Sequence, residues 1–244
     1  MIKDILQQIY PSNCVLCGVS CNTGRNLCNS CAADIRVNNS ACSRCAIPLP
    51  LVSQGSLCGQ CLQNPPEYNA AWSAFIYAQP LEWMIHQLKF NAKLSFATTM
   101  SALAEPHLPV LNSRPDCIVP VPLHLKRIKE RGFNQALELV KPLAQKLAIP
   151  IDTKSCFRKN STSAQTGLNA KHRRQNIKDA FVFKNTHKYK YIVLFDDVVT
   201  TGSTMGELAK IIKLQGVERV DVWSLARAEK SSQKNKNIKM ENLK

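Results

Sequence analysis

The sequence predicts an α/β protein in which a parallel sheet flanked by helices follows a small N-terminal metal-binding domain. Nine of the eleven cysteines lie between residues 14 and 61. From residue 71 to residue 226, short apolar segments alternate with segments of helical periodicity. This alternation is typical of a parallel sheet with helices on its faces. At 244 residues, the chain is long enough to form both units.

Four Cys-x-x-Cys pairs characterise the N-terminal part. They are Cys14 and Cys17, Cys28 and Cys31, Cys42 and Cys45, and Cys58 and Cys61. Two such pairs supply the four thiolates of one tetrahedral structural zinc ion, so the eight cysteines predict two zinc ions. A unit this small buries little apolar surface, and we therefore expect the metal to contribute most of its folding free energy.

The spacing of the cysteines leaves open which pairs share a zinc ion. Consecutive pairing gives two stacked zinc ribbons and is the arrangement that we favour, whereas interleaved pairing gives a RING-like cross-brace. A redox role is a weaker interpretation, because a reactive Cys-x-x-Cys normally occurs once, at the start of a helix. Catalytic zinc is disfavoured because four thiolates close the site and the histidines lack the H-x-E pattern of zinc deaminases.

We expect three parts along the chain. They are a double zinc-ribbon domain over residues 1–63, an α/β domain over residues 67–228, and a disordered basic tail over residues 229–244. The Asn64-Pro65-Pro66 segment marks the first boundary, because paired prolines disfavour both helix and sheet. The tail is rich in lysine and contains few apolar residues, which is typical of disorder.

Strands and helices alternate within the α/β domain. The expected strands cover residues 74–77, 116–121, 191–195 and 219–225. The expected helices cover residues 81–90, 95–111, 134–147 and 203–214. The strand over 191–195 is continuously apolar, as expected of a strand buried on both faces of a parallel sheet.

The acidic pair Asp196 and Asp197 comes directly after the expected strand over 191–195, and the hydroxyl-rich segment Thr200–Thr204 follows it. Ligands of open parallel sheets bind at this carboxyl edge. Backbone amides, hydroxyl groups and a helix N-terminus can hold one phosphate, and Gly202 allows close approach of the chain. The two carboxylates can accept hydrogen bonds from neighbouring ribose hydroxyls and help to hold Mg²⁺. A phosphate at one end and a diol at the other describe a ribose 5-phosphate.

Three other interpretations of this segment are weaker. A Walker B strand would require a phosphate-binding loop of the form G-x-x-x-x-G-K-[ST], which the sequence lacks. A dinucleotide site would require G-x-G-x-x-G, which is also missing. A simple helix cap explains one hydroxyl group and leaves the acidic pair without a role.

Positive charge is concentrated in one part of the chain. The formal net charge is +15, and residues 124–190 contribute +12 of it, with 16 lysines or arginines and four acidic residues. This concentration favours a polyanionic partner, either a phosphorylated small molecule or a nucleic acid. The alternative is a solvated lysine-rich surface.

The chain contains no stretch of roughly 18 apolar residues, and Met1-Ile2-Lys3-Asp4 lacks the apolar core of a secretory signal. We therefore expect a cytoplasmic protein without membrane insertion. Cytosolic thiols are kept reduced, so the cysteines favour metal binding over a disulfide framework. Cys21 is expected to be a spare thiol, and Cys117 and Cys156 are expected to be small core residues.

The segment Val193–Thr204 resembles the binding motif for 5-phosphoribosyl-1-pyrophosphate (PRPP) of type I phosphoribosyltransferases. From residue 14 to about residue 228, the chain resembles the ComF/GntX family, which joins a double zinc ribbon to a domain of that fold. Further matches are Leu88-Lys89-Phe90, Val119-Pro120-Val121-Pro122-Leu123, Arg131-Gly132-Phe133-Asn134-Gln135, and the dispersed set Arg158, Gln165, Leu168, Arg173 and Asn176.

The resemblance implies roles for individual residues. The PRPP-binding residues would be Asp196, Asp197, Val198, Thr200, Thr201, Gly202, Ser203, Thr204, Pro120, Val121, Pro122 and Arg131, with Asp196 and Asp197 also catalytic and Mg²⁺ bound together with PRPP. Pro120–Leu123 would form the pyrophosphate loop, with Lys126 and Arg127 near it in sequence. Residues 158–176 would form a flexible loop that closes over PRPP. Composition alone also describes a mobile basic lid there, with Arg158, Lys159, Lys171, Arg173 and Arg174, or else a disordered basic loop.

Two hypotheses of function follow. The first is a phosphoribosyltransferase that acts on an unidentified acceptor. The second is a binder of single-stranded DNA, implied by the association of ComF proteins with DNA uptake in natural transformation and supported by the basic stretch. Both can hold together, with PRPP closing the lid and altering the DNA-binding surface. The zinc ribbon is also a candidate surface for protein partners.

Overall fold

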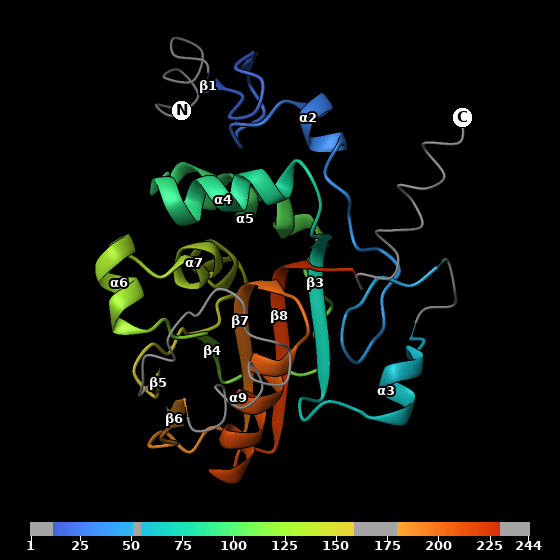
Figure 1. Cartoon of the computed structure of the whole chain (residues 1–244), viewed down its shortest axis with the longest axis vertical. Helices are drawn as coiled ribbons and strands as arrows, with labels where there is room; N and C mark the ends of the chain where they lie inside the picture. The colour runs from blue at the N-terminus through green and yellow to red at the C-terminus, as the bar shows by residue number, and fades with distance from the viewer. Residues whose placement is uncertain (1–11, 51–54, 159–179, 230–244) are drawn as a thin grey trace, which may run out of the picture.

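A four-stranded parallel sheet forms the centre of the protein (Figure 1). The computed structural model describes residues 12–50, 55–158 and 180–229. The strand order is β3-β8-β7-β4, with β3 at Ala70–Ile76, β8 at Arg219–Arg227, β7 at Tyr191–Val199 and β4 at Cys117–Pro120. The sheet confirms the predicted α/β class. Residues Tyr191–Phe195 are buried, because helices cover both faces of the strand that they form.

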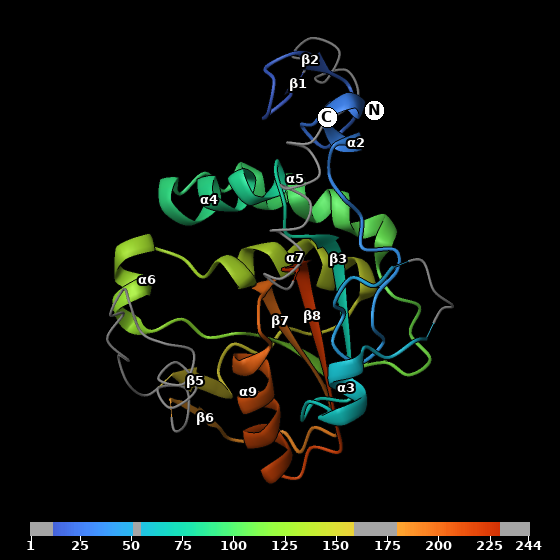
Figure 2. The same ribbon diagram turned by 45° about the vertical axis from the view of Figure 1, so that its right-hand side comes forward.

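Helices form a layer on each face of the sheet (Figures 1 and 2). The first face carries α4 (Leu81–Asn91), α5 (Ser95–Ala104) and α7 (Gln135–Leu147), and the second face carries α9 (Ser203–Leu214). Successive side chains of a strand point to opposite faces. Accordingly, Val193 and Phe195 join the core under α4, α5 and α7, whereas Ile192 and Leu194 join the core under α9.

Several element boundaries differ from the sequence-based expectation. The helix expected over 95–111 ends at Ala104 and continues only as the 3-10 turn Glu105–His107. Pro106 lies in that turn and lacks a backbone N–H, which removes one helical hydrogen bond and disfavours continuation of the α-helix. The strand expected over 74–77 begins earlier, at Ala70, because β8 offers hydrogen-bonding partners from Asp221 to Arg227.

Three short elements were not expected from the sequence. They are α6 (Leu125–Arg131) and the antiparallel pair of β5 (Cys156–Arg158) and β6 (Phe181–Phe183). None of the residues of α6 is buried, so it has no apolar stripe that would indicate a helix. Phe181 and Phe183 pack in the core on the α9 face, with Cys117 and Cys156.

The N-terminal part contacts the main domain at two places. Its elements are β1 (Ser12–Asn13), β2 (Ser20–Cys21), α2 (Asn29–Ala33) and α3 (Gly59–Gln63). The portion around α2 lies over α4, and α3 lies beside β3 (Figures 1 and 2). Between them, Val37 pairs with Phe75 in an antiparallel bridge, and the amide of Asn38 donates to the carbonyl oxygen of Ala74 (3.0 Å). This segment therefore covers part of the edge of β3.

Among the described residues, every helix is too short or too polar to cross a bilayer. The expected tail lies outside the described residues apart from Glu229, and the division of the chain at residues 63–67 stays a prediction.

Candidate functional site

The structure gathers the eight cysteines into two clusters and confirms consecutive pairing. The first cysteine cluster is Cys14, Cys17, Cys28 and Cys31, and the second is Cys42, Cys45, Cys58 and Cys61. Within each cluster, the sulfur atoms all lie within 4.8 Å of one another. Four thiolates in such a cluster match the closed coordination of structural zinc. The two clusters therefore fit two structural zinc ions, one in each.

The two clusters share local geometry but differ in exposure. Cys28 precedes α2 and Cys58 precedes α3, each as the helix N-cap residue. Backbone amides point at sulfur in both clusters, from Cys31 to Sγ of Cys28 (3.4 Å) and from Cys58 to Sγ of Cys42 (3.3 Å). All four cysteines of the second cluster are buried, whereas Cys17 in the first is exposed. The second metal is therefore better shielded from solvent.

The acidic pair lies inside β7 rather than after its end. We expected the strand to stop at Phe195, but β7 continues to Val199. The reason is its neighbour, because β8 extends to Arg227 and pairs Asp196 with Ser224 and Val199 with Arg227. The carboxylates are consequently held on rigid backbone near the carboxyl end of the sheet, where ligands bind in open parallel sheets.

Asp197 is buried against the first helical face. Its Oδ2 atom forms an ion pair with the ammonium group of Lys89 on α4, and its Oδ1 atom accepts a hydrogen bond from Nε2 of Gln135 on α7 (3.4 Å). Only 3% of Asp197 is exposed. A buried carboxylate requires such a counter-charge. Both of its oxygen atoms are thus engaged by the protein itself.

Asp196 is less buried than Asp197, but ionisation of its carboxyl group is unfavourable. Removal from solvent raises its pKa well above the ordinary value of 3.8, and the adjacent charge of Asp197 raises it further. Its Oδ1 atom accepts a hydrogen bond from the backbone amide of Asp197 (2.9 Å). Asp196 is partly exposed, so it is the member of the pair that a ligand can reach.

The expected pyrophosphate loop lies beside the acidic pair. Pro120 is opposite Phe195 in the β4–β7 ladder, and the amide of Val121 donates to the carbonyl oxygen of Phe195 (2.8 Å). The side chain of Asn134 donates to the carbonyl oxygen of Val121 (3.0 Å) and so ties this segment to the start of α7. Pro122 follows as a partly buried residue.

Arg131 extends this arrangement toward solvent. Its Nη1 atom donates to Oε1 of Gln135 (2.8 Å), and its guanidinium carbon lies 5.3 Å from the ring centroid of Phe90. Gln135 in turn contacts Asp197, so one hydrogen-bonded chain links Arg131 to the acidic pair. Burial and the charge of Arg127 lower the pKa of Arg131, while the charge of Asp197 acts in the opposite direction. Arginine stays charged in proteins, so a cation is available next to the carboxylates.

The Thr200–Thr204 loop joins β7 to α9. Gly202 has a φ of +78° and is the N-cap residue of α9, a backbone conformation that glycine adopts without strain. The hydroxyl groups of Thr201 and Ser203 lie 2.9 Å apart, and the amide of Gly206 donates to the carbonyl oxygen of Gly202 (2.9 Å). Thr204 and Ser203 are partly buried, and Thr200 is exposed. Val198 packs partly against the first helical face.

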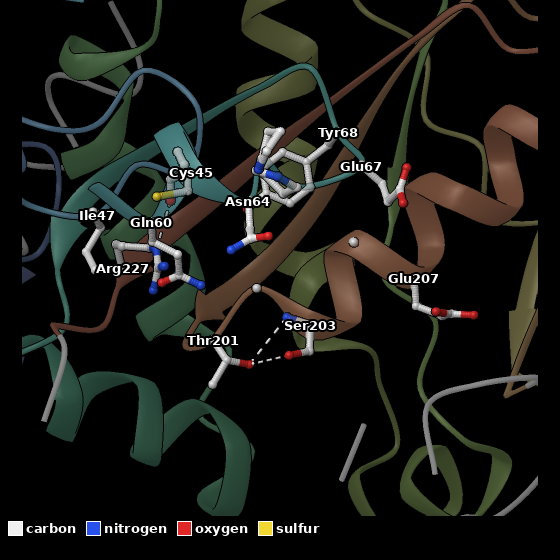
Figure 3. Close-up of a pocket in the computed structure, with 15 residues that line it drawn as sticks. Cys45, Ile47, Gln60, Asn64, Glu67, Tyr68, Thr201, Ser203, Glu207 and Arg227 are labelled. Atoms are coloured by element: carbon white, nitrogen blue, oxygen red, sulfur yellow. Dashed lines mark hydrogen bonds between the residues drawn. The ribbon is translucent and has the colours of Figure 1, made fainter. Parts of the chain in front are cut away.

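A cavity of about 490 Å³ separates this loop from the second cysteine cluster (Figure 3). Figure 3 shows Cys45, Gln60 and Arg227 on one side of the cavity, and Glu67 and Glu207 on the other. The backbone of the Thr200–Thr204 loop forms part of its wall through residues 201–203. The second cluster and the loop are therefore neighbours in space, although they are far apart in sequence.

The basic lid falls almost wholly outside the described residues. Lys159, Lys171, Arg173 and Arg174 are in this part of the chain. Arg158 is described, and its guanidinium carbon lies 5.3 Å from the ring centroid of Phe181. Burial lowers the pKa of Arg158, and the charge of Arg127 acts in the same direction.

Sequence analysis did not assign three residues that the structure brings to this region. Lys89 and Gln135 lie in matched family segments without a role, and the structure connects both to Asp197. Arg227 was not singled out, and it contacts the loop and the second cluster. The signal for Lys89 was its position between the apolar residues Leu88 and Phe90, and Arg227 offered none beyond its place at the end of an apolar strand.

Comparison with known proteins agrees with this architecture. Residues 5–62 match the double zinc ribbon domain family. The chain is 36% identical over 225 residues to the DNA utilization protein YhgH of Escherichia coli O157:H7, which covers 89% of this chain and 97% of that protein. It is 35% identical over 234 residues to competence protein F of Haemophilus influenzae, covering 91% and 100%, respectively. The chain belongs to the ComF family. Competence protein ComFC of Streptococcus pneumoniae is a more distant relative, 25% identical over 153 residues that cover 63% of this chain and 66% of that protein.

Proposed function

We propose that this ComF protein binds PRPP through a phosphoribosyltransferase-like site and handles single-stranded DNA in the cytoplasm during DNA uptake. One observation carries the first half of the proposal. The acidic pair, the Pro120–Pro122 segment, Arg131 and the Thr200–Thr204 loop converge at the carboxyl end of β4 and β7. The names of the relatives, DNA utilization protein and competence protein, support the second half.

Each part of PRPP has a complementary group in this arrangement. The loop offers hydroxyl groups and the N-terminus of α9, a 12-residue helix, to the 5-phosphate. Asp196 is accessible to ribose hydroxyls, and Asp197 holds the site together through Lys89 and Gln135. Arg131 supplies a fixed positive charge near the Pro120–Pro122 segment for the pyrophosphate.

The oxygen atoms of this site could hold Mg²⁺ only together with oxygen atoms of bound PRPP. Asp197 is committed to Lys89 and Gln135, so Asp196 and the phosphates of PRPP would hold the ion. When bound, Mg²⁺ would neutralise part of the charge on the pyrophosphate. The ammonium group of Lys89 supplies a positive charge of the protein's own beside the same carboxylates.

Transfer would break the bond between C1 of the ribose and pyrophosphate, and an acceptor nucleophile would form the new bond to C1. The protein's residues would contribute by position and charge: Asp196 would orient the ribose, and Arg131 would stabilise the departing pyrophosphate. A metabolic phosphoribosyltransferase without a nucleic-acid role is the alternative, and pyrophosphate release in the presence of a small acceptor, without any affinity for DNA, would favour it.

The decisive experiment is titration of the full-length protein with PRPP by calorimetry, with and without Mg²⁺. We expect binding that the double substitution Asp196→Asn, Asp197→Asn abolishes. Asp196→Asn removes a charged hydrogen-bond acceptor for the ribose, which costs about 1.5–3 kcal/mol, and Asp197→Asn removes the carboxylate that holds Lys89 and Gln135 in place. Asp34→Asn is the matched control, since Asp34 is exposed at the end of α2. Absence of heat with the wild-type protein, or an unchanged affinity in the double variant, would refute the site.

A parallel titration tests the interaction with DNA. Fluorescent single-stranded DNA should bind with an affinity that falls as salt increases, because bound phosphates release counterions. Replacing Lys126 and Lys129 on α6 with alanine should reduce the salt slope by about one for each phosphate that is no longer neutralised. Lys210→Ala on α9 is the control, as an exposed lysine outside the basic stretch. A slope that is identical in all three proteins would refute DNA binding at α6.

A further inference from the structure

One arginine joins the second cysteine cluster to the Thr200–Thr204 loop. Arg227 is the last residue of β8, and only 4% of it is exposed. Its Nε atom donates to the carbonyl oxygen of Cys45 (2.9 Å). Its Nη1 atom donates to the carbonyl oxygen of Val199 (2.9 Å) and also to that of Thr200. The planar guanidinium group of Arg227 thus holds the backbone at Cys45 on one side and the beginning of the Thr200–Thr204 loop on the other.

The charges around Arg227 also favour its position between the second cysteine cluster and the Thr200–Thr204 loop. Four thiolates around Zn²⁺ leave a net charge of about −2, and a guanidinium group beside them stays protonated. Among the residues that the structure describes, Arg227 forms no ion pair with a carboxylate. A zinc-loaded second cluster would supply negative charge next to this buried cation. Its hydrogen bonds all go to backbone carbonyl oxygens, which fixes backbone rather than side chains.

A second contact restricts the conformation of the Thr200–Thr204 loop, on the side that faces the second cysteine cluster. A Cβ atom built on Gly202 would lie 3.2 Å from the hydroxyl oxygen of Tyr68. Tyr68 is buried, and the chain on both sides of it is held by Arg44, whose guanidinium donates to the carbonyl oxygens of Pro66 (3.0 Å) and Asn69 (2.8 Å). Figure 3 shows Tyr68 above the loop and Arg227 at its side. Arg227 and Tyr68 thus bound the loop in two places, and both positions are hydrogen-bonded to the segment that carries the second cluster.

The first cysteine cluster makes no comparable contact. Within the described residues, the hydrogen bonds of Cys14, Cys17, Cys28 and Cys31 are made inside the segment 13–35. Its apolar side chains, including Leu27 and Ile35, pack in the core with residues of α4 and α5. Only the second metal centre is therefore in a position to influence the loop.

We propose that the second zinc centre fixes the conformation of the Thr200–Thr204 loop through Arg227, which acts as a positioning residue for the proposed 5-phosphate site. Zinc keeps Cys45 and its carbonyl oxygen in place and supplies the negative charge that holds the guanidinium. The guanidinium in turn fixes the carbonyl oxygens of Val199 and Thr200, which precede the amides expected to bind phosphate. The first zinc ion has no part in this coupling. The inference about PRPP affinity rests on the proposed function, whereas the coupling to the loop does not.

The test compares full-length wild-type protein with Arg227→Lys and Arg44→Lys. Lysine keeps the charge but loses the planar fork, so it cannot hold carbonyl oxygens on both sides. In Arg227→Lys we expect amide hydrogen exchange in residues 201–204 to become about tenfold faster, with two zinc ions retained. We expect the dissociation constant for PRPP to rise by about tenfold or more, as for loss of a hydrogen bond to a charged group. Arg44→Lys changes the segment between Cys42 and Cys45 but reaches the loop only indirectly, through Tyr68. Exchange there should therefore accelerate clearly less than in Arg227→Lys, by no more than about twofold relative to wild type.

Unchanged loop exchange in Arg227→Lys would overturn the coupling, and so would equal acceleration in Arg44→Lys. If the wild-type protein does not bind PRPP, the proposed function fails, but hydrogen exchange still decides the coupling. A second pair of variants separates the metals: Cys58→Ser should loosen the loop, whereas Cys17→Ser should not. Equal loop exchange in these two proteins, each with one zinc ion removed, would also overturn the proposal.

Discussion

The two cysteine clusters each consist of two Cys-x-x-Cys pairs and each contain a cysteine that caps a helix, yet they are attached to the protein in different ways. The first shares a continuous apolar core with α4 and α5 through residues such as Leu27 and Ile35. The second forms a small cluster of its own with Ile47 and connects to the main domain mainly through hydrogen bonds of Arg44 and Arg227. Apolar burial is large and non-directional, whereas hydrogen bonds hold a defined geometry. The first cluster therefore contributes to stability, and the second determines the geometry of the adjacent loop.

The largest expected effect is the loss of stability when one apolar residue next to each cysteine cluster is truncated. Comparing the two losses tests whether the clusters are attached differently. Leu27 is fully buried in the shared core, so Leu27→Ala should lower the free energy of unfolding by about 3 kcal/mol. Ile47 lies in the small second cluster and is 8% exposed, so Ile47→Ala should cost about half as much, because fewer side chains pack against it. Urea denaturation in the presence of zinc measures both values. Equal losses of stability would show that the two clusters are attached alike.

A smaller change in stability, of opposite sign, is expected when Asp196, which lies next to the loop, is replaced. The pKa of Asp196 is raised in the folded protein, so the unfolded chain loses its proton first as the pH rises above about 4. The free energy of unfolding consequently falls as the pH rises through the folded pKa. Asp196→Asn removes this penalty and should stabilise the protein by about 1 kcal/mol at neutral pH. The difference should vanish near pH 3, where both states are protonated.

Thermal unfolding of wild type and Asp196→Asn across pH 3–8 measures this difference. Binding of PRPP should show the opposite trend to stability, becoming tighter as Asp196 ionises with rising pH. Asp34→Asn serves again as the control. A destabilised Asp196→Asn protein at neutral pH would contradict the burial of an unfavourable charge at this site.

The smallest expected effect concerns the order in which the metals leave. Cys17 is exposed, whereas every cysteine of the second cluster is buried, so a chelator should remove the first zinc ion several times faster. Release measured with a colorimetric zinc indicator should therefore have two phases. The rate of amide hydrogen exchange in residues 201–204 should change only during the slow phase of zinc release. Loosening of the loop during the fast phase would remove the distinction between the two clusters.

Local sequence patterns predicted much of the fold. Eight paired cysteines indicated two metal sites, because thiolate spacing is a local property of the chain. The apolar segment Tyr191–Phe195 indicated a buried strand, and helix α9 begins at Ser203 as expected. The helix expected over 95–111 was wrong at its end, where the 3-10 turn that contains Pro106 follows Ala104. The roles assigned to the acidic pair and the Thr200–Thr204 loop stay predictions.

The sequence by itself determined the kinds of groups that the protein contains: tetrathiolate ligands, a carboxylate pair, a glycine-centred loop and alternating strands and helices. The tertiary structure decided which of them meet. It paired the cysteines consecutively, joined Lys89 to Asp197, and brought Cys45 within hydrogen-bonding distance of Arg227, 182 positions away in the chain. The physical reason is that residue spacing specifies local conformation and ligand type, whereas contacts between distant segments depend on how helices and strands pack around the common core.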